Sequence, residues 1–147
     1  MKHFDYFAPT EIIFGAGRVT EAGALAARYG KKAMLVTVPE FPAVAELYAK
    51  VKKSLADAGV ACVHYDGVIP NPTTELVTRG AELAKAEGVD VVIGLGGGSS
   101  MDTAKAIAVE ATHPGTAWDY NCHTAGPTEQ TLPILAISTT AGTGSQT

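Results

Sequence analysis

The chain has 147 residues, of which 46% are hydrophobic and 18% charged, and these proportions are typical of one globular domain. Its formal net charge of -4 argues against nucleic acid as a partner, and no apolar run approaches the roughly 20 residues needed to span a bilayer. With two cysteines and no apolar signal-peptide core at the amino terminus, we expect a cytoplasmic protein without membrane contact.

The amino-terminal part predicts a short β-hairpin followed by a helix. Residues 4–7 and 11–14 are aromatic or β-branched and are separated by Pro9, a pattern that predicts two strands and a turn. Thr20 is placed to cap a helix that runs to about Ala27, with Gly30 just past its end.

Strands and helices alternate through the rest of the chain. Four apolar segments predict buried strands: residues 33–38, 61–65, 91–93 and 132–137. Three helices are predicted between them: residues 42–58, 73–87 and 104–109. This alternation predicts the α/β class, a Rossmann-like parallel sheet with helices on both faces, and ligands bind such sheets beyond the carboxyl ends of the strands.

The most informative stretch joins the third predicted strand to the helix that follows. Residues 94–105 read GLGGGSSMDTAK. Successive glycines let the backbone approach a ligand closely, and the N–H groups of a helix amino terminus suit a phosphate. The stretch fits neither the Walker A pattern nor the dinucleotide fingerprint, whose third glycine would fall at Met101. Packing alone is the alternative explanation, and phosphate binding is the favoured one.

Three motifs together resemble the amino-terminal domain of the iron-containing (group III) alcohol dehydrogenase family. They are YDGVIPNPT at residues 65–73, GGGSSMDTAK at 96–105 and TTAGTGS at 139–145. Their order and spacing agree over essentially the whole chain. Ser99 resembles the alcohol dehydrogenase branch, since the glycerol dehydrogenase branch more often has lysine there.

The resemblance implies an NAD(P)-dependent oxidoreductase, an alcohol dehydrogenase or aldehyde reductase. Such an enzyme transfers a hydride between the nicotinamide and a small primary alcohol or aldehyde with the help of iron or zinc. Residues 1–147 then form the NAD(P)-binding domain. The chain stops within a loop, so we expect a fragment of a longer two-domain enzyme that is inactive alone. The metal ligands are expected beyond Thr147, in a carboxy-terminal helical domain.

The resemblance also implies which residues bind the coenzyme. The backbone amides of Gly97, Gly98 and Ser99, next to Gly96, would hold the pyrophosphate. The floor beneath the coenzyme would be lined by three hydroxyl side chains: Thr139, Thr140 and Thr143.

Three further positions concern the ribose groups. Asn71 would shape the adenosine end of the cleft, or would only form a turn. Asp102 would accept a hydrogen bond from a ribose near the nicotinamide, or would only stabilise the start of the helix, with Lys105 as its ion-pair partner. Val38 stands where family members that prefer NAD often carry an acid. An acid there would repel a 2′-phosphate, and Glu40 is near enough in sequence to take over that role. We predict that NAD and NADP both bind, with only a moderate preference.

Several alternatives remain. His113, Cys122 and His123 are close in sequence, but three ligands without a fourth make a zinc site an unfavoured interpretation. The chain could instead be a stand-alone or flavodoxin-like nucleotide-binding module, or a glycerol-dehydrogenase-like or dehydroquinate-synthase-like relative. In the resembled family the opening strands pair with a partner subunit, so a homodimer or higher homo-oligomer is expected.

Overall fold

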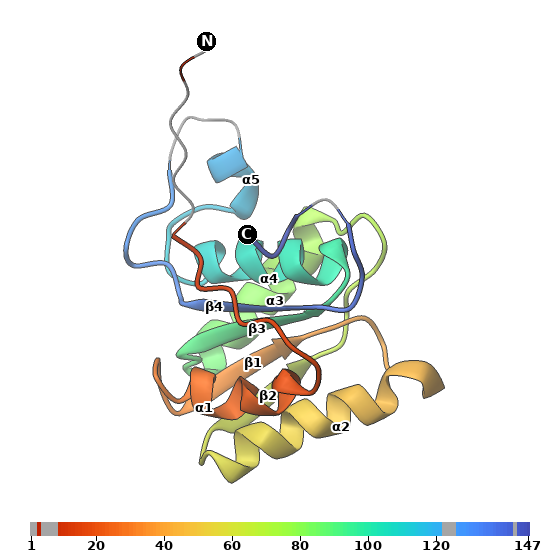
Figure 1. Ribbon diagram of the computed structural model, residues 1–147. Helices are drawn as coiled ribbons and strands as arrows, with labels where there is room; N and C mark the ends of the chain where they lie inside the picture. Colours follow the sequence, from red (N-terminus) through yellow and green to blue (C-terminus); the bar gives the residue numbers. More distant parts are fainter. Residues whose placement is uncertain (1–2, 4–8, 122–125, 143) are drawn as a thin grey trace.

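The computed structural model describes residues 3, 9–121, 126–142 and 144–147, and a four-stranded sheet lies at its centre (Figure 1). All neighbouring strands are parallel, in the order β2-β1-β3-β4. The strands are β1 (Lys32–Val36), β2 (Ala61–Tyr65), β3 (Val91–Gly96) and β4 (Ile134–Ser138). The predicted parallel α/β sheet is confirmed.

Helices cover both faces of this sheet (Figure 1). A 3-10 turn, η1 (Arg18–Glu21), leads into α1 (Ala22–Ala26), which packs with α2 (Pro42–Asp57) on one face. On the other face lie α3 (Thr74–Glu87) and α4 (Gly98–Glu110), and the short α5 (Ala117–Asn121) follows α4. No helix in the described part of the chain is long and apolar enough to cross a bilayer.

The strand side chains alternate between two apolar cores. Leu35 and Ile93 pack with α1 and α2, whereas Met34 and Val92 pack with α3 and α4. All four are fully buried. Burial on both faces explains why these strands are nearly continuous apolar runs in the sequence.

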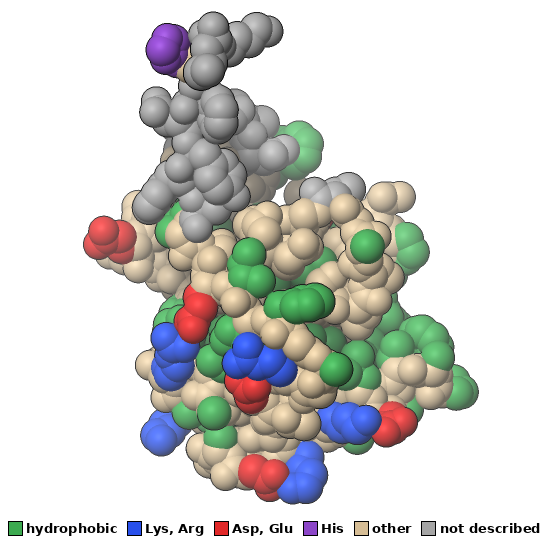
Figure 2. Space-filling view, viewed as in Figure 1, with side chains coloured by type: hydrophobic (Ala, Val, Ile, Leu, Met, Phe, Trp, Pro, Cys, Tyr) green, Lys and Arg blue, Asp and Glu red, His purple; other side chains and the backbone are tan. Residues whose placement is uncertain are grey.

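The surface carries charges of both signs side by side. Basic and acidic side chains are neighbours on the face shown in Figure 2. Arg18 and Glu21 form one such exposed pair at 2.8 Å. Exposed pairs of this kind contribute little to the free energy of unfolding.

Two of the amino-terminal predictions differ from the structure. Residues 4–7 lie outside the described residues, and residues 11–14 form no strand. A strand needs a hydrogen-bonded partner, and no described segment pairs with this one; Ile12 is 72% and Phe14 91% exposed. Thr20 does not cap a helix. Gly17, at φ 78°, starts η1 earlier in the chain, so Thr20 lies inside it and its hydroxyl donates to the Gly17 carbonyl at 3.0 Å.

Candidate functional site

The strand order identifies one place where a crevice can form. From β1 the chain moves to β2 on one side and later to β3 and β4 on the other, so the order reverses between β1 and β3. Ligands of open α/β sheets bind at such a switch point, beyond the carboxyl ends of the two strands. Val38 follows β1 and Gly97 follows β3, so the fold brings these two predicted site residues to the same edge of the sheet.

The connection from β3 to α4 is a single residue. The strand continues to Gly96 and the helix begins at Gly98, six residues before the predicted start at Ala104. Close packing is the reason. A Cβ atom at Gly94 would lie 2.9 Å from both the Cα of Met101 and the Cβ of Ala104. The glycine run therefore belongs to the strand and the helix, and we call residues 96–99 the glycine turn.

The glycines of this region differ in whether the fold requires them. Gly96 has φ 144°, and a Cβ there would lie 2.6 Å from the Ser100 hydroxyl oxygen. Packing and backbone conformation thus require glycine at 94 and 96, as the packing alternative proposed. Gly97 has φ -83° and ψ -171°, which any residue adopts, and a Cβ there would meet only an ordinary contact, the Thr140 hydroxyl oxygen at 3.5 Å. The described fold therefore does not require glycine at 97, and the absence of a side chain leaves the backbone of this turn open to close approach.

The amino terminus of α4 offers free hydrogen-bond donors. The N–H groups of Ser100 and Met101 donate to the Gly97 carbonyl at 3.1 and 3.3 Å, and no side chain caps the helix. Within the described residues, the N–H groups of Gly98 and Ser99 have no acceptor, and both residues are half-buried. Unpaired amides at the positive end of a 13-residue helix suit an anion such as a diphosphate.

One further hydroxyl lies beneath the turn and was missed by the sequence analysis. The Ser100 side chain is 1% exposed, and its oxygen has no hydrogen-bond partner among the described residues. The sequence carried no separate signal for it, since Ser99 and Ser100 are adjacent and chemically identical.

The segment after β4 runs beside the glycine turn. The Thr139 N–H donates to the Gly96 carbonyl at 3.0 Å, and Thr140 faces Gly97. Ser138, not singled out from the sequence, donates its hydroxyl hydrogen to the Thr140 carbonyl at 2.8 Å and so shapes this bend. The fold thus brings Thr139 and Thr140 to the site, while Thr143 lies outside the described residues.

Asn71 forms the turn that the sequence suggested. Its φ of 53° makes it the one non-glycine residue with left-handed φ in the described part of the chain. Asparagine tolerates this conformation better than most residues. Its side chain is exposed and has no hydrogen bond to a described residue, so the amide is also free to meet a ligand. Both functions considered for Asn71 are compatible with this placement.

The predicted pair of Asp102 and Lys105 is not formed. Asp102 is exposed, lies beyond the first turn of α4 and has no ion-pair partner among the described residues. Lys105 instead makes a long 3.5 Å contact with the Thr147 carbonyl oxygen. Asp102 therefore does not serve as a helix-start carboxylate, and its side chain is available to a ligand at the turn.

The imagined zinc cluster finds no support in the described residues. His113 is buried and both of its ring nitrogens are engaged: Nε2 accepts the Thr128 N–H at 3.0 Å and Nδ1 lies 3.0 Å from the Val109 carbonyl oxygen. Cys122 and His123 lie outside the described residues. No group of three or more His, Cys, Asp or Glu side chains in the described part could hold a metal ion.

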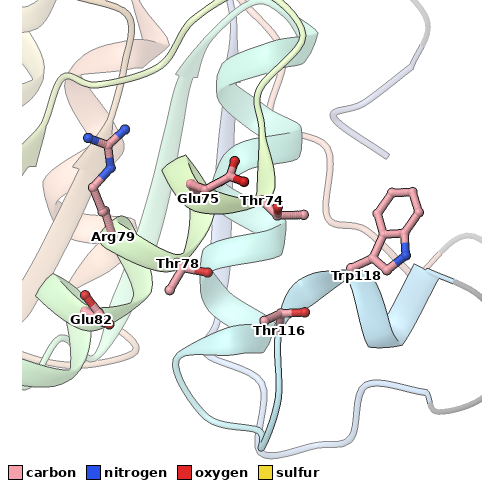
Figure 3. A pocket seen from close by; sticks show the side chains of 7 residues that line it. All are labelled: Thr74, Glu75, Thr78, Arg79, Glu82, Thr116 and Trp118. Atoms are coloured by element: carbon pink, nitrogen blue, oxygen red, sulfur yellow. The ribbon is translucent and has the colours of Figure 1, made fainter.

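A separate hollow of about 850 Å³ lies between α3 and α5 (Figure 3). Thr74 and Glu75 on α3 face Trp118 on α5 across it, and Trp118 is 59% exposed. None of the predicted coenzyme residues is among its described lining residues. It is distinct from the glycine turn.

The chain matches known proteins over nearly its whole length. The family model described as iron-containing alcohol dehydrogenase matches residues 9–147. A choline dehydrogenase from Bacillus subtilis is 45% identical to this chain, covering 99% of the chain and 37% of that relative.

Solved structures give the same result. An archaeal halo-thermophilic alcohol dehydrogenase from a Red Sea brine pool superposes with a TM-score of 0.91 at 40% identity, covering 98% of this chain and 38% of that one. An NADH-dependent butanol dehydrogenase A from Thermotoga maritima superposes with a TM-score of 0.87 at 34% identity, covering 98% and 36%. The chain therefore spans little more than a third of the length of these relatives.

Proposed function

The chain belongs to the iron-containing alcohol dehydrogenase family, whose members are oxidoreductases, and from that membership we propose that residues 1–147 are the NAD(P)-binding domain of a longer, two-domain enzyme. Relatives of this chain include NADH-dependent alcohol dehydrogenases. The membership favours a dehydrogenase over the stand-alone nucleotide-binding module. A substrate screen of the full-length protein distinguishes an alcohol dehydrogenase from a glycerol-dehydrogenase-like enzyme.

One observation carries the coenzyme site. Among the described residues, the amides of Gly98 and Ser99 have no acceptor at the start of α4, next to the position where a Cβ of residue 97 would stand. In the proposal these amides hold the coenzyme pyrophosphate over Gly97, and Thr139 and Thr140, with Thr143, lie beneath it. Asp102 accepts from a ribose hydroxyl, and Asn71 and Val38 meet the adenosine end. When bound, the nicotinamide supplies the hydride-transfer chemistry, and the domain supplies binding and orientation.

The proposed reaction is hydride transfer between nicotinamide and a small primary alcohol or aldehyde. The described residues do not fit a metal ion, so we place the iron or zinc outside them, among ligands of a carboxy-terminal helical domain. The isolated chain then binds coenzyme and turns over no alcohol. We further propose that the protein is cytoplasmic and forms a homo-oligomer. For the oligomer, the exposed Ile12 and Phe14 near the amino terminus offer apolar surface that a partner subunit would cover.

Coenzyme titration tests the proposal. Because Val38 carries no carboxylate to repel a 2′-phosphate, NADH and NADPH are both expected to bind in calorimetry, with affinities less than a hundredfold apart. Gly97→Leu fills the space beside Thr140 and is expected to weaken both at least tenfold. Gly126→Leu is the control, since a Cβ there meets no atom of the described residues within 4 Å. Unchanged binding by Gly97→Leu overturns the site, and a preference for NADH above a hundredfold overturns dual use.

A further inference from the structure

A cluster of hydrogen bonds lies under the carboxyl end of β1. The Thr37 side chain is fully buried, and its hydroxyl donates to the Val38 carbonyl at 2.8 Å. Tyr48, on α2, donates its hydroxyl hydrogen to the same carbonyl at 3.3 Å. The Thr37 oxygen also lies 2.9 Å from Nε2 of His64. Since the Thr37 hydrogen is committed to the carbonyl, Nε2–H of His64 is the donor in that contact.

The backbone of Thr37 connects two loops of the crevice. Its N–H donates to the Tyr65 carbonyl at 3.0 Å, and its carbonyl accepts the Val68 N–H at 3.1 Å. The segment that follows β2 and contains Asn71 is thereby attached to the end of β1. Val38 and Asn71, both assigned to the adenosine end of the coenzyme, are thus linked through one residue.

The carbonyl of Val38 is turned toward the protein interior by these contacts. Tyr48 is 1% exposed, so a carbonyl that accepts from its hydroxyl faces the interface of β1 and α2. A carbonyl free to face the crevice would accept from a ribose hydroxyl and repel a 2′-phosphate, as a carboxylate would. Because the Val38 carbonyl already accepts from two hydroxyl donors, residue 38 offers the ribose 2′ position neither a carboxylate nor an unpaired carbonyl.

The surroundings of His64 keep this arrangement uncharged. Its ring packs edge-on against Tyr48, with centroids 5.9 Å apart. Burial, followed by the nearby Lys52 charge, lowers the pKa of His64, while Asp66 and Glu40 oppose the shift. The ring is therefore neutral at pH 7 and adds no cation near the turn at Val38.

We propose that Thr37, supported by His64 and assisted by Tyr48, is a positioning residue that sets the coenzyme preference by holding the Val38 carbonyl away from the adenosine ribose. This inference rests on the proposed coenzyme site. It concerns how the site distinguishes a 2′-hydroxyl from a 2′-phosphate on the adenosine ribose. The glycine turn, which is proposed to hold the pyrophosphate, does not make this distinction.

Calorimetry of the 147-residue chain with ADP-ribose and with 2′-phospho-ADP-ribose tests it, because the ratio of the two dissociation constants is insensitive to a general loss of stability. Thr37→Val removes the hydroxyl and is expected to shift the ratio at least fivefold toward ADP-ribose. Thr37→Ser retains the hydroxyl and is expected to leave the ratio within twofold of the wild-type value.

His64→Leu and Tyr48→Phe extend the test if Thr37→Val does not fold. Each is expected to shift the ratio two- to threefold in the same direction, and His64→Leu to add nothing in the Thr37→Val background, since it acts through that hydroxyl. Tyr120→Phe, which loses a hydroxyl bonded to the Pro114 carbonyl at 2.8 Å, is the control and leaves the ratio unchanged.

The outcomes separate this inference from the site on which it rests. The positioning role alone is overturned by one set of results. In it, the wild type binds, Gly97→Leu does not, and the ratio of the two dissociation constants is unchanged in the folded variants of Thr37, His64 and Tyr48. A wild-type chain that binds neither ligand overturns the coenzyme site and the positioning role together.

Discussion

Replacing Gly97 by serine is expected to make the chain more stable and the coenzyme site weaker. Gly97 occupies the N-cap position of α4, where no side chain caps the helix. Its φ of -83° admits serine without strain, and the new Cβ has an ordinary 3.5 Å contact with Thr140. Serine is among the preferred N-cap residues because its hydroxyl oxygen accepts an N–H of the first helical turn. Of the two N–H groups within reach of such a cap, those of Ser99 and Ser100, the Ser99 N–H is a donor assigned to the pyrophosphate, since that of Ser100 already donates to the Gly97 carbonyl.

The two effects have different sizes. Serine in place of glycine at an N-cap raises the free energy of unfolding by a few tenths of a kcal/mol, or about 1 °C in Tm for a chain of this length. A hydrogen bond to a charged phosphate is worth about 1.5–3 kcal/mol, so withdrawing one donor weakens binding by about 10- to 100-fold. Stability and affinity therefore move in opposite directions.

Thermal unfolding and calorimetry with NADH measure both quantities on the same samples. Gly126→Ser is the matched control, because a Cβ at 126 meets no described residue within 4 Å, and it is expected to change neither the stability nor the affinity. If Gly97→Ser binds NADH as tightly as the wild type, the amides of this helix terminus do not hold the coenzyme. If it lowers the free energy of unfolding by more than about 1 kcal/mol, glycine at 97 is needed by the fold and the reasoning is wrong.

Three more predictions follow from the same structure. Gly94→Ala places a Cβ 2.9 Å from the Ala104 Cβ, and this overpacking is expected to lower the free energy of unfolding by about 1–3 kcal/mol in urea titrations, with partial recovery in Gly94→Ala/Ala104→Gly. The Asp90 carboxylate accepts the N–H groups of Lys31 and Lys32 at 2.7 and 2.9 Å, and these bonds lower its pKa below the ordinary 3.8. Asp90→Asn is therefore expected to lose about 1 kcal/mol of stability at pH 7, with the difference shrinking as the pH falls below 3.8, and a difference equal at pH 7 and pH 2 would contradict this. The isolated chain is expected to produce no NADH from butanol and NAD, with or without added Fe²⁺ or Zn²⁺, and metal-dependent turnover above a no-protein blank would refute the placement of the metal elsewhere.

The sheet was predictable from the sequence because burial on both faces leaves a simple pattern. Residues 61–65 were predicted as a strand and form one with the same bounds, and Pro42 opens α2 as expected. Residues 11–14 have the same strand-like composition but no described partner to pair with. Local composition records β propensity, whereas pairing depends on which other segments lie alongside.

The site was only partly predictable, for a related reason. The glycine run indicated close backbone approach but not which glycine served which purpose. Gly94 and Gly96 allow α4 to pack on β3, and only the packed structure distinguishes them from Gly97. For the same reason the helix was predicted to start at Ala104, since glycines and serines are poor helix formers until tertiary contacts hold them. The helical spacing of Asp102 and Lys105 suggested a pair that the structure does not form.

The one-residue connection between β3 and α4 also has a kinetic and thermodynamic consequence. A loop that must become ordered around its ligand loses conformational entropy and slows association, whereas residues 96–99 are already fixed by the strand on one side and the helix on the other. Recognition of a dinucleotide here is expected to be of the lock-and-key type, with the amide donors preorganised before the encounter and almost no backbone displacement when the ligand arrives.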